Sequence, residues 1–456
     1  MQFIVMAAGQ GKRMYSRLPK VLHPLAGRPL VAHVLDAARS LSPVALCLVV
    51  GHGGDAVRKA LAADDLAFVT QDPPRGTGDA VRVALTALGD DAVTVVANGD
   101  CPLIPAATFA AIGARAAAGH LALLTAKVSD PTGLGRILRD PAGNVRAIVE
   151  ERDANRAERA VGEIYTGVLA APTALLRRWV AALKDDNAQR EFYLTDIVAM
   201  AVADGVTVEG HVAADERDIL GVNDRAQLAA IERIVQARQA DLLLASGTWI
   251  ADPARIDVRG PLTCGRDVRI DVGCVFEGTV TLGDDVSVGA HCVLKNVGVG
   301  AGTQIAPFSH LEDAAIGANC RIGPYARLRP GASLADDVHI GNFVEVKQSS
   351  VGAGSKANHL AYIGDATIGR NVNVGAGTIT CNYDGANKFR TVIEDDAFIG
   401  SDTQLVAPVT VGRGATLGAG TTLTRDAPPD TLTVSRVKQL SIPGWQRPRK
   451  QPKPQG

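Results

Sequence analysis

The chain has 456 residues and a formal net charge of −1, from 47 Lys and Arg against 48 Asp and Glu. This near-neutral balance argues against a bulk nucleic-acid binder and against a polybasic membrane-surface protein. Hydrophobic residues make up 46% and charged residues 21% of the sequence, which excludes disorder for most of the chain. The length predicts at least two domains, and because aromatic residues are only 4%, their cores must be mainly aliphatic.

The seven cysteines are scattered, none forms a CxxC pair, and their number is odd. They are therefore predicted to be small buried residues in a reducing compartment, not a disulfide framework or a zinc ribbon. The N-terminus lacks the charged start and the long apolar run of a signal peptide, and no stretch of 18 apolar residues is available to span a membrane. We therefore expect a cytoplasmic protein with no membrane span.

Short apolar runs alternate with helix-like stretches over the first half of the chain. Such alternation, with near-continuous apolar strands, predicts an α/β, Rossmann-like domain with a mostly parallel sheet. Ligands of these sheets bind at the carboxyl ends of the strands. The expected strands are residues 3–6, 44–50, 67–69 and 93–97, and the expected helices are residues 29–40, 56–62 and 79–88.

A long helix is expected from Asp224, a plausible N-cap, to Leu244. We interpret it as the connection between two domains. The predicted boundaries are 1–225 for the first domain, 226–246 for the linker helix and 247–456 for the second domain. Apolar residues recur along the helix at helical spacing. They are Leu228, Ile231, Ile234, Val235 and Leu242.

After Pro253 an apolar residue recurs at every sixth position, with two slips of five. This period is typical of a β-solenoid, in which one apolar side chain per hexapeptide points inward and three hexapeptides form a triangular coil. The period alone does not fix the handedness. Residues 381–390 interrupt it and are predicted to project as a loop, and the basic tail at 443–456 is expected to be solvated or to dock on a neighbouring subunit. The predicted inward residues are Ile270, Phe276, Leu282, Val288, Leu294, Val299, Ile305, Leu311, Ile316, Ile322, Leu328, Leu334, Ile340, Val346, Ile393, Ile399, Leu405, Val411, Leu417 and Leu423.

The first expected strand is followed directly by a glycine-containing segment, residues 6–14 (MAAGQGKRM). Its small residues would let backbone N–H groups approach a phosphate, with Arg13 as fixed positive charge, although a plain strand–turn–helix junction explains it as well. Lys20, which follows a proline, is a candidate for a second phosphate contact or an exposed charge. Asp100 follows the strand at 93–97, where it can hold Mg²⁺ beside substrate phosphates or cap a helix.

In the second half, the candidate for acid–base chemistry is His359. Acyl transfer to an amine requires a base for the amine and donors for the oxyanion. His359 lies outside the inward positions, and an isolated histidine is more often a structural or surface residue. Polar and cationic residues recur near it along successive coils, however, and the cations suit a sugar phosphate. These residues are Arg329, Lys347, Tyr362, Asn373, Asn382 and Tyr383.

An ordered series of motifs runs through the first half: AAGxGxRM, LPK, Gln71 with Gly76-Thr77-Gly78, GDxPL, Gly133-Leu134-Gly135-Arg136, and Gly221-Val222-Asn223-Asp224. In this order they resemble the motifs of sugar-nucleotide pyrophosphorylases. Together with the hexapeptide half, residues 1–447 resemble the bacterial family of bifunctional N-acetylglucosamine-1-phosphate uridylyltransferases and glucosamine-1-phosphate N-acetyltransferases. The resemblance implies an α/β nucleotidyltransferase domain joined by a long helix to a left-handed parallel β-helix, assembled as a homotrimer.

The resemblance implies a uridylyl-transfer site in the first half, where the sugar phosphate attacks the α-phosphate of UTP and pyrophosphate leaves with Mg²⁺. Arg13 and Lys20 would be catalytic residues that neutralise the triphosphate, and Asp100 and Asn223 would hold Mg²⁺. The other implied binding residues are Met6, Ala7, Ala8 and Gly9 at the uridine and phosphates, Gln71, Gly76 and Thr77 at the uracil, Asn98 and Gly99 beside Asp100, and Gly135, Glu150 and Tyr165 at the amino sugar.

Two of these positions depart from the family pattern. Tyr165 stands where the family has the Asn of an NTG triplet that contacts the sugar. Asn98 stands where relatives often have Tyr before the Gly-Asp pair. A tyrosine can hydrogen-bond to a sugar but is far larger than an asparagine, so the first change alters the implied sugar contact more than the second.

The resemblance also implies an acetyl-transfer site in the second half, with acetyl-CoA as co-substrate. His359 would be the general base for the amine of glucosamine 1-phosphate, and Arg329 and Lys347 would bind its phosphate. Tyr362 and Asn373 would line the sugar site. The residues implied at the acetyl group and at CoA are Ala376, Asn382, Tyr383, Ser401, Ala419 and Arg436.

The expected function is therefore bifunctional: acetylation of glucosamine 1-phosphate, then transfer of UMP from UTP to N-acetylglucosamine 1-phosphate. The product, UDP-N-acetylglucosamine, would supply the bacterial cell wall and, where present, lipopolysaccharide. One alternative is a nucleotidyltransferase whose solenoid only regulates or oligomerises; another is a scaffold or binding protein with a vestigial pyrophosphorylase domain. The intact cluster around His359 argues against the first, and intact Arg13, Lys20, Asp100 and Asn223 argue against the second.

Overall fold

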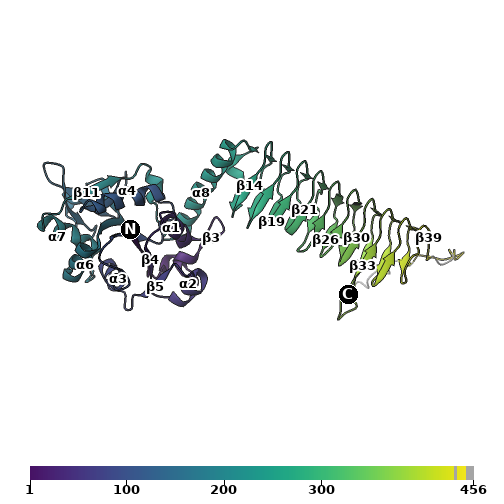
Figure 1. Cartoon of the computed structure of the whole chain (residues 1–456), viewed down its shortest axis with the longest axis horizontal. Coiled ribbons are helices and arrows are strands. Elements are labelled where there is room, and N and C mark those ends of the chain that lie inside the picture. The colour runs from purple at the N-terminus through teal and green to yellow at the C-terminus, as the bar shows by residue number, and fades with distance from the viewer. Residues whose placement is uncertain (436–438, 448–456) are drawn as a thin grey trace, which may run out of the picture. The chain divides into compact units, whose positions relative to one another are not determined.

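The computed structural model describes residues 1–435 and 439–447, which form two compact units (Figure 1). The first unit comprises Met1–Leu242 and Asp257–Gly260; the second contains Leu243–Ile256 and continues from Pro261. No helix among the described residues combines the length and the apolar character needed to cross a membrane.

A nine-stranded mixed sheet forms the centre of the first unit. Its main path runs β11-β7-β10-β6-β1-β4-β5, and β8 and β9 extend from β10. The central strand β1 is parallel to both of its neighbours, whereas β10 is antiparallel to β6 and β7. The strands are β1 (Gln2–Ala7), β4 (Ala45–Val50), β5 (Ala67–Thr70), β6 (Val93–Asn98), β7 (Leu121–Lys127), β8 (Gly135–Arg139), β9 (Val145–Val149), β10 (Glu163–Pro172) and β11 (Val208–Val212), with a separate hairpin of β2 (Pro24–Leu25) and β3 (Arg28–Pro29).

Helices cover both faces of this sheet (Figure 1), which explains why its strands are apolar on both sides. Alternate residues of β1 enter different cores: Ile4 packs with α3, α6 and α7, and Phe3 packs with α1, α2 and α4. The four expected strands and the three expected helices are all present. The α-helices are α1 (Leu30–Arg39), α2 (Gly54–Leu61), α3 (Thr77–Leu85), α4 (Ala106–Ala117), α5 (Arg156–Arg159), α6 (Thr173–Ala182), α7 (Ile197–Ala203) and α8 (Arg225–Ala245), with 3₁₀ turns at Lys12–Met14, Lys20–Leu22, Leu194–Asp196, Glu216–Ile219 and Pro253–Arg255.

Helix α8 is the predicted long helix, and its 21 residues match the expected range closely. Asp224 caps it: the Gln227 backbone N–H donates to the Asp224 side chain at 2.9 Å. Ile231 and Val235 of the expected apolar stripe are buried. Leu242 lies on the same helix but is 71% exposed, because helical spacing selects a face without ensuring that another element covers it.

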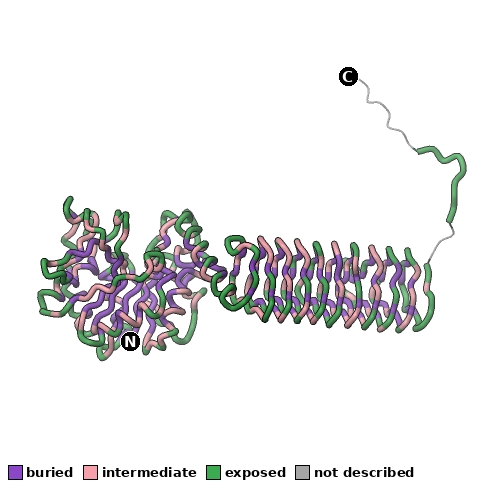
Figure 2. Tube along the Cα trace, turned by 90° about the horizontal axis from the view of Figure 1, so that it is seen from above, coloured by how far each residue is buried: buried purple, intermediate pink, exposed green. Residues whose placement is uncertain are grey.

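The repeats of the second half form two sheets, of 11 and 17 strands, with parallel pairing from coil to coil. Equivalent positions are 17 or 18 residues apart, as in the Arg269–Ser287 and Ser287–Gln304 pairs, so three hexapeptides make one coil. Every predicted inward residue is buried, and Figure 2 shows buried residues recurring in each coil.

Short strands build these coils, usually two or three residues each. They are β12 (Trp249–Ile250), β13 (Asp257–Arg259), β14 (Leu262–Cys264), β15 (Arg269–Ile270), β16 (Val275–Glu277), β17 (Val280–Leu282), β18 (Ser287–Val288), β19 (Val293–Val299), β20 (Gln304–Ile305), β21 (His310–Ile316), β22 (Arg321–Ile322), β23 (Arg327–Leu328), β24 (Ser333–Leu334), β25 (His339–Asn342), β26 (Glu345–Lys347), β27 (Ser350–Val351), β28 (Lys356–His359), β29 (Tyr362–Gly364), β30 (Ala366–Ile368), β31 (Asn373–Val374), β32 (Ile379–Cys381), β33 (Thr391–Ile393), β34 (Phe398–Ile399), β35 (Gln404–Val406), β36 (Val409–Val411), β37 (Thr416–Leu417), β38 (Thr422–Leu423) and β39 (Leu432–Thr433).

The expected loop interrupts the coil between β32 and β33. There the pair Asn373–Phe398 is 25 residues apart instead of 17 or 18, so the loop is an insertion that leaves the stacking of the coils intact. An isolated antiparallel bridge between Tyr383 and Lys388 closes the loop.

Candidate active sites

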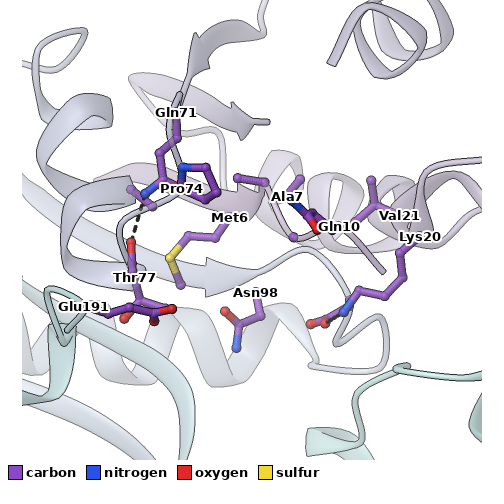
Figure 3. A pocket seen from close by; sticks show the side chains of 15 residues that line it. Met6, Ala7, Gln10, Lys20, Val21, Gln71, Pro74, Thr77, Asn98 and Glu191 are labelled. Carbon is purple, nitrogen blue, oxygen red and sulfur yellow. Dashed lines mark hydrogen bonds and ion pairs between the residues drawn. The ribbon is translucent and has the colours of Figure 1, made fainter. Parts of the chain in front are cut away.

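The main functional candidate in the first unit is a cleft of about 400 Å³ at the carboxyl ends of β1 and β6. The chain leaves β1 toward β4 on one side and returns to β6 on the other, so this is the switch point where open α/β sheets bind ligands. Figure 3 shows Met6 and Asn98 in the floor, between Thr77 on one side and Lys20 on the other. The lining residues are Met6, Ala7, Ala8, Gly9, Gln10, Lys20, Val21, Gln71, Pro74, Gly76, Thr77, Ala80, Asn98, Asp100 and Glu191.

The segment after β1 turns sharply beside Lys20. Gly11 adopts a φ of +60°, and a side chain there would place its Cβ only 2.7 Å from the Lys20 Cβ, so this close approach requires glycine. The 3₁₀ turn at Lys12–Met14 follows. Arg13, Lys20 and Asn223 line an adjoining depression of about 260 Å³. Two of the predicted phosphate-binding cations therefore lie on one wall.

Lys20 connects the two residues predicted to hold a metal. Its ammonium forms an ion pair with the Asp100 carboxylate and lies 3.5 Å from the Asn223 side-chain oxygen. Asp100 is kept in place by its backbone carbonyl, which accepts from the Val222 N–H at 2.9 Å. A carboxylate and an amide oxygen thus converge on one positive charge, which is the hard-oxygen chemistry that Mg²⁺ prefers.

Gln71, Gly76 and Thr77 form the wall opposite Lys20. The buried Gln71 amide nitrogen donates to the Gly76 carbonyl at 2.9 Å and to the Asp79 carboxylate at 3.0 Å, which fixes the orientation of its side chain. Gly76 has a φ of +104°, and a Cβ there would lie 2.7 Å from the Phe192 carbonyl oxygen. Thr77 begins α3 and accepts the Leu194 N–H at 3.2 Å.

A second cleft of about 200 Å³ shares Met6, Thr77 and Asn98 with the first, so the two are continuous. Its far wall contains Glu150, which accepts a hydrogen bond from the Thr195 hydroxyl at 3.2 Å. Burial raises the pKa of Glu150, and the neighbouring Asp196 and Asp153 add to this effect. The remaining lining residues are Gly133, Leu134, Gly135, Tyr165, Thr166, Gly167, Leu194 and Thr195.

The two residues that depart from the family pattern face the same cleft. Tyr165 is buried, and its hydroxyl has no hydrogen-bond partner among the described residues. Burial, together with the Glu150 charge, raises the pKa of Tyr165. The Asn98 amide lies where a side chain at Gly167 would point, so glycine is required there. The Tyr165 hydroxyl is thus a buried polar group beside the cleft whose hydrogen-bonding capacity is unused.

In the solenoid, the predicted general base lies at one corner of the coils. His359 ends β28, is exposed, and its Nδ1 lies 2.9 Å from the Asn342 side-chain oxygen in the preceding coil. Backbone hydrogen bonds join each coil to the next, as from the Gly377 N–H to the His359 carbonyl. They place four predicted residues at equivalent corners of successive coils. These residues are His359, Ala376, Ser401 and Ala419.

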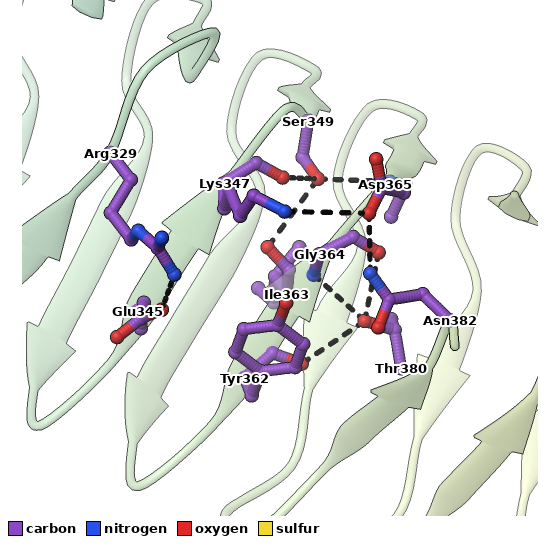
Figure 4. Close-up of polar contacts among 11 residues, drawn as sticks. Arg329, Glu345, Lys347, Ser349, Tyr362, Ile363, Gly364, Asp365, Thr380 and Asn382 are labelled. Carbon is purple, nitrogen blue, oxygen red and sulfur yellow. Dashed lines mark hydrogen bonds and ion pairs between the residues drawn. The ribbon is translucent and has the colours of Figure 1, made fainter. Parts of the chain in front are cut away.

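The predicted phosphate-binding residues lie near each other on adjacent strands: Arg329 directly follows β23, and Lys347 ends β26 (Figure 4). Arg329 donates to Glu345 at 2.8 Å, which raises the pKa of Arg329. Lys347 lies 4.0 Å from Asp365, and Asp365 also accepts from the Asn382 amide. Tyr362 on β29 belongs to the same group, because it pairs in register with Glu345, the partner of Arg329.

Two predicted residues lie apart from this group, and a third is not among the described residues. Asn373 on β31 pairs with Lys356 on β28, in the sheet that carries His359. Tyr383 is exposed on the inserted loop, and its hydroxyl donates to the Gly385 carbonyl at 2.6 Å. Arg436 lies outside the described residues, as does part of the basic tail.

The structure also brings forward residues that the sequence did not single out. Glu191 lines the first cleft, Thr195 supports Glu150, and Asn342 supports His359. Lys388 of the inserted loop lies beside Lys347, whose side-chain contact and charge lower the pKa of Lys388. The only sequence signal for Asn342 is its position 17 residues before His359, which is one coil.

Comparisons with known proteins match the two halves separately and the chain as a whole. The MobA-like NTP transferase domain matches residues 3–195, the GMPPB C-terminal domain matches 258–356, and six bacterial transferase hexapeptide repeats match 390–425. The chain is 62% identical over 453 residues to the bifunctional protein GlmU of Cupriavidus taiwanensis, covering 99% of this chain and 100% of that protein. The chain belongs to the GlmU family. The GlmU proteins of Azoarcus sp. and Nitrosospira multiformis are 61% and 58% identical over 451 and 455 residues, covering at least 99% of each chain.

Membership in the GlmU family confirms the predicted resemblance and the predicted fold class. It also confirms that this is a bifunctional enzyme, with a nucleotidyltransferase half followed by a hexapeptide-repeat transferase half. The alternatives in which the chain is a scaffold, or in which the solenoid has no activity, do not agree with this membership. The assignments of individual residues remain predictions.

Proposed function

We propose that this GlmU-family chain acetylates glucosamine 1-phosphate with acetyl-CoA and then transfers UMP from UTP to N-acetylglucosamine 1-phosphate. The observation that carries the uridylyl half is the continuity of the two clefts through Met6, Thr77 and Asn98. Nucleotide bound in the larger cleft and sugar bound in the smaller one would place the sugar phosphate against the α-phosphate. Nucleotidyl transfer needs this positioning more than acid–base chemistry.

In that step an oxygen of the sugar phosphate forms a bond to the α-phosphorus, and the bond from that phosphorus to pyrophosphate breaks. Arg13 and Lys20 neutralise the triphosphate from one wall. Gln71 presents its fixed amide group, and with it the backbone around Gly76, to the uracil. Glu150 and Tyr165 bind the hydroxyl and amide groups of the sugar. These roles follow from the family resemblance and agree with where the side chains lie.

Mg²⁺ fits the donor set beside the triphosphate wall. Asp100 and Asn223 would hold it, because their side-chain oxygens already converge on the Lys20 ammonium. When bound, the ion supplies positive charge that stabilises the phosphate oxygens. Lys20 would then turn from Asp100 toward the phosphates, so the chain itself exchanges an internal ion pair for a substrate contact.

In the acetyl-transfer half, His359 takes a proton from the amine of glucosamine 1-phosphate as the nitrogen attacks the thioester carbon. The carbon–sulfur bond then breaks, and the thiolate of CoA takes up a proton. Arg329 and Lys347 bind the sugar phosphate, with Tyr362 and Asn373 at the sugar. The corner that carries His359 continues along the coils with Ala376, Ser401 and Ala419. These small residues leave room for the pantetheine arm of acetyl-CoA. Further acetyl-CoA contacts come from Asn382, Tyr383 and Arg436.

We further propose a cytoplasmic homotrimer. Its support on the solenoid is a row of stacked rings at one corner, Phe308, Tyr325 and Phe343, with centroids 5.0 and 5.2 Å apart and each about half exposed. An exposed aromatic row of this kind marks a surface that a second chain can cover. Sedimentation should give the mass of three chains, and a monomer with full acetyl-transfer activity would contradict the assembly.

The substrate assignment is tested by exchanging the sugar phosphates between the two assays. Pyrophosphate release from UTP is expected with N-acetylglucosamine 1-phosphate and to be far slower with glucosamine 1-phosphate. Thiol release from acetyl-CoA is expected only with glucosamine 1-phosphate. Equal rates with both sugars in the UTP assay would overturn the assigned order of the two steps.

A further inference from the structure

The side chain that contacts His359 comes from the neighbouring coil. Asn342 and His359 are paired in register on the adjacent strands β25 and β28, and the Asn342 side-chain oxygen lies 2.9 Å from His359 Nδ1. Asn342 is partly buried, and the backbone N–H that follows His359 donates to its carbonyl at 3.1 Å. Asn342 is therefore held through both its main chain and its side chain.

We propose that Asn342 is a positioning residue for acetyl transfer, which fixes the tautomer of His359. A neutral imidazole has one N–H donor and one lone-pair acceptor. An amide oxygen can only accept, so it keeps the proton on Nδ1. The lone pair is then on Nε2, the nitrogen that faces away from Asn342 and can take a proton from an amine. The inference rests on the proposed role of His359 as general base.

The charges around His359 explain why an uncharged partner suits this position. Arg321 on β22, His339 on β25 and Lys356 on β28 occupy adjacent strands of the same sheet. Burial, followed by the charges of Arg321, Lys356 and His359, lowers the pKa of His339. This part of the sheet therefore already disfavours an additional positive charge. A carboxylate at residue 342 would instead stabilise the imidazolium form of His359, which cannot accept the amine proton.

Two substitutions separate positioning from a structural role. Asn342→Ala should lower kcat for thiol release about tenfold, the effect of one lost neutral hydrogen bond, with the KM values for acetyl-CoA and glucosamine 1-phosphate unchanged. Asn342→Asp should move the acidic limb of the pH–rate profile up by at least about one unit. Gln304→Ala, an exposed amide on β20 of the same sheet, is the matched control and should leave both quantities unchanged.

Nitrogen-15 spectra of the full-length protein labelled at histidine report the tautomer directly. The His359 signals, assigned by their loss in His359→Ala, should show Nδ1 protonated in the wild type and a mixture of tautomers in Asn342→Ala. Uridylyl transfer in the same samples shows that the variants are folded. Wild-type protein without thiol release would refute the proposed acetyl transfer itself; an active wild type with an unchanged kcat, pH profile and tautomer in both Asn342 variants would refute only the role of Asn342.

Discussion

The ammonium of Lys20 forms an ion pair with the carboxylate of Asp100, in the cleft at the carboxyl ends of β1 and β6. Both side chains are largely shielded from solvent, so the pair is screened less than one at the surface. Asp100 and Asn223 both direct side-chain oxygen atoms at the Lys20 ammonium. This arrangement of one cation and two oxygen donors supports the proposed uridylyl site.

Lys20→Gln should reduce uridylyl transfer about 10²–10³-fold, because it removes a positioned charge from the triphosphate wall. Acetyl transfer by the same protein should be unchanged. Pyrophosphate release and thiol release, measured on one preparation, test both statements. Lys59→Gln, an exposed lysine on α2, serves as the control and should affect neither rate. Equal losses in both assays would point to misfolding instead of a local role.

Glu150→Gln should separate stability from sugar binding. Burial raises the pKa of Glu150 above its value in the unfolded chain, so its ionisation opposes folding and wild-type stability falls as pH rises through that interval. The variant should therefore have the higher Tm at pH 7–8, an advantage that disappears below about pH 4, where the carboxyl is protonated in both states.

The same Glu150 variant should raise the KM for N-acetylglucosamine 1-phosphate about tenfold to a hundredfold, the effect of a lost charged hydrogen bond, without changing the KM for UTP. Thermal unfolding at several pH values and steady-state kinetics provide the two measurements. A variant with a lower Tm than the wild type at pH 8 would contradict the sign of the pKa shift.

Tyr165→Phe tests the unpaired hydroxyl in the sugar cleft. Because this hydroxyl has no partner among the described residues, its removal should leave Tm equal or higher. If it binds the sugar, the KM for N-acetylglucosamine 1-phosphate should rise about threefold to tenfold. By contrast, Tyr193→Phe loses a 2.9 Å hydrogen bond from Gln189 and should lower the stability by about 1 kcal/mol. An unchanged KM in Tyr165→Phe would remove the hydroxyl from the sugar site.

The solenoid repeat predicts adjacent residues with opposite sensitivity to truncation. Ile322 is buried inside the coil and Arg321, its neighbour on β22, is exposed. Ile322→Ala should lower the free energy of unfolding by about 2–5 kcal/mol, whereas Arg321→Ala should change it by less than about 0.5 kcal/mol. Denaturant unfolding of both variants measures the difference. Similar costs would contradict the assigned inward face.

Periodicity in the sequence was sufficient to predict much of the architecture. The six-residue recurrence predicted inward residues such as Phe276 and Leu417, because residues one repeat apart occupy equivalent inward positions of the coil. It did not predict the smaller residues buried two positions earlier, such as Cys274 and Ala415. The motif series also predicted residues that the fold brings together, as with Lys20, Asp100 and Asn223. In both cases local spacing or motif order carries the information.

Other features depend on which residues become neighbours after folding. Asn342 could not be singled out, since its contact with His359 requires the coil register, which the slips from six to five residues make variable. Thr195 reaches Glu150 from a segment 45 residues away. Leu242 fits the helical stripe and is nevertheless exposed, because spacing does not specify what packs against a helix.

The proposed function requires two independent active sites in one chain that carry out successive reactions. The most direct test mixes the wild type, Lys20→Gln or His359→Ala with acetyl-CoA and glucosamine 1-phosphate, then adds UTP and Mg²⁺, and follows thiol and pyrophosphate in turn. We expect both products from the wild type, and from Lys20→Gln normal thiol release with pyrophosphate formation slower by about 10²–10³-fold. From His359→Ala we expect thiol release slower by about 10²–10⁴-fold, with pyrophosphate formation restored by added N-acetylglucosamine 1-phosphate. Normal thiol release by His359→Ala, or pyrophosphate formation at an equal rate without any acetylated sugar, would contradict the two-site function.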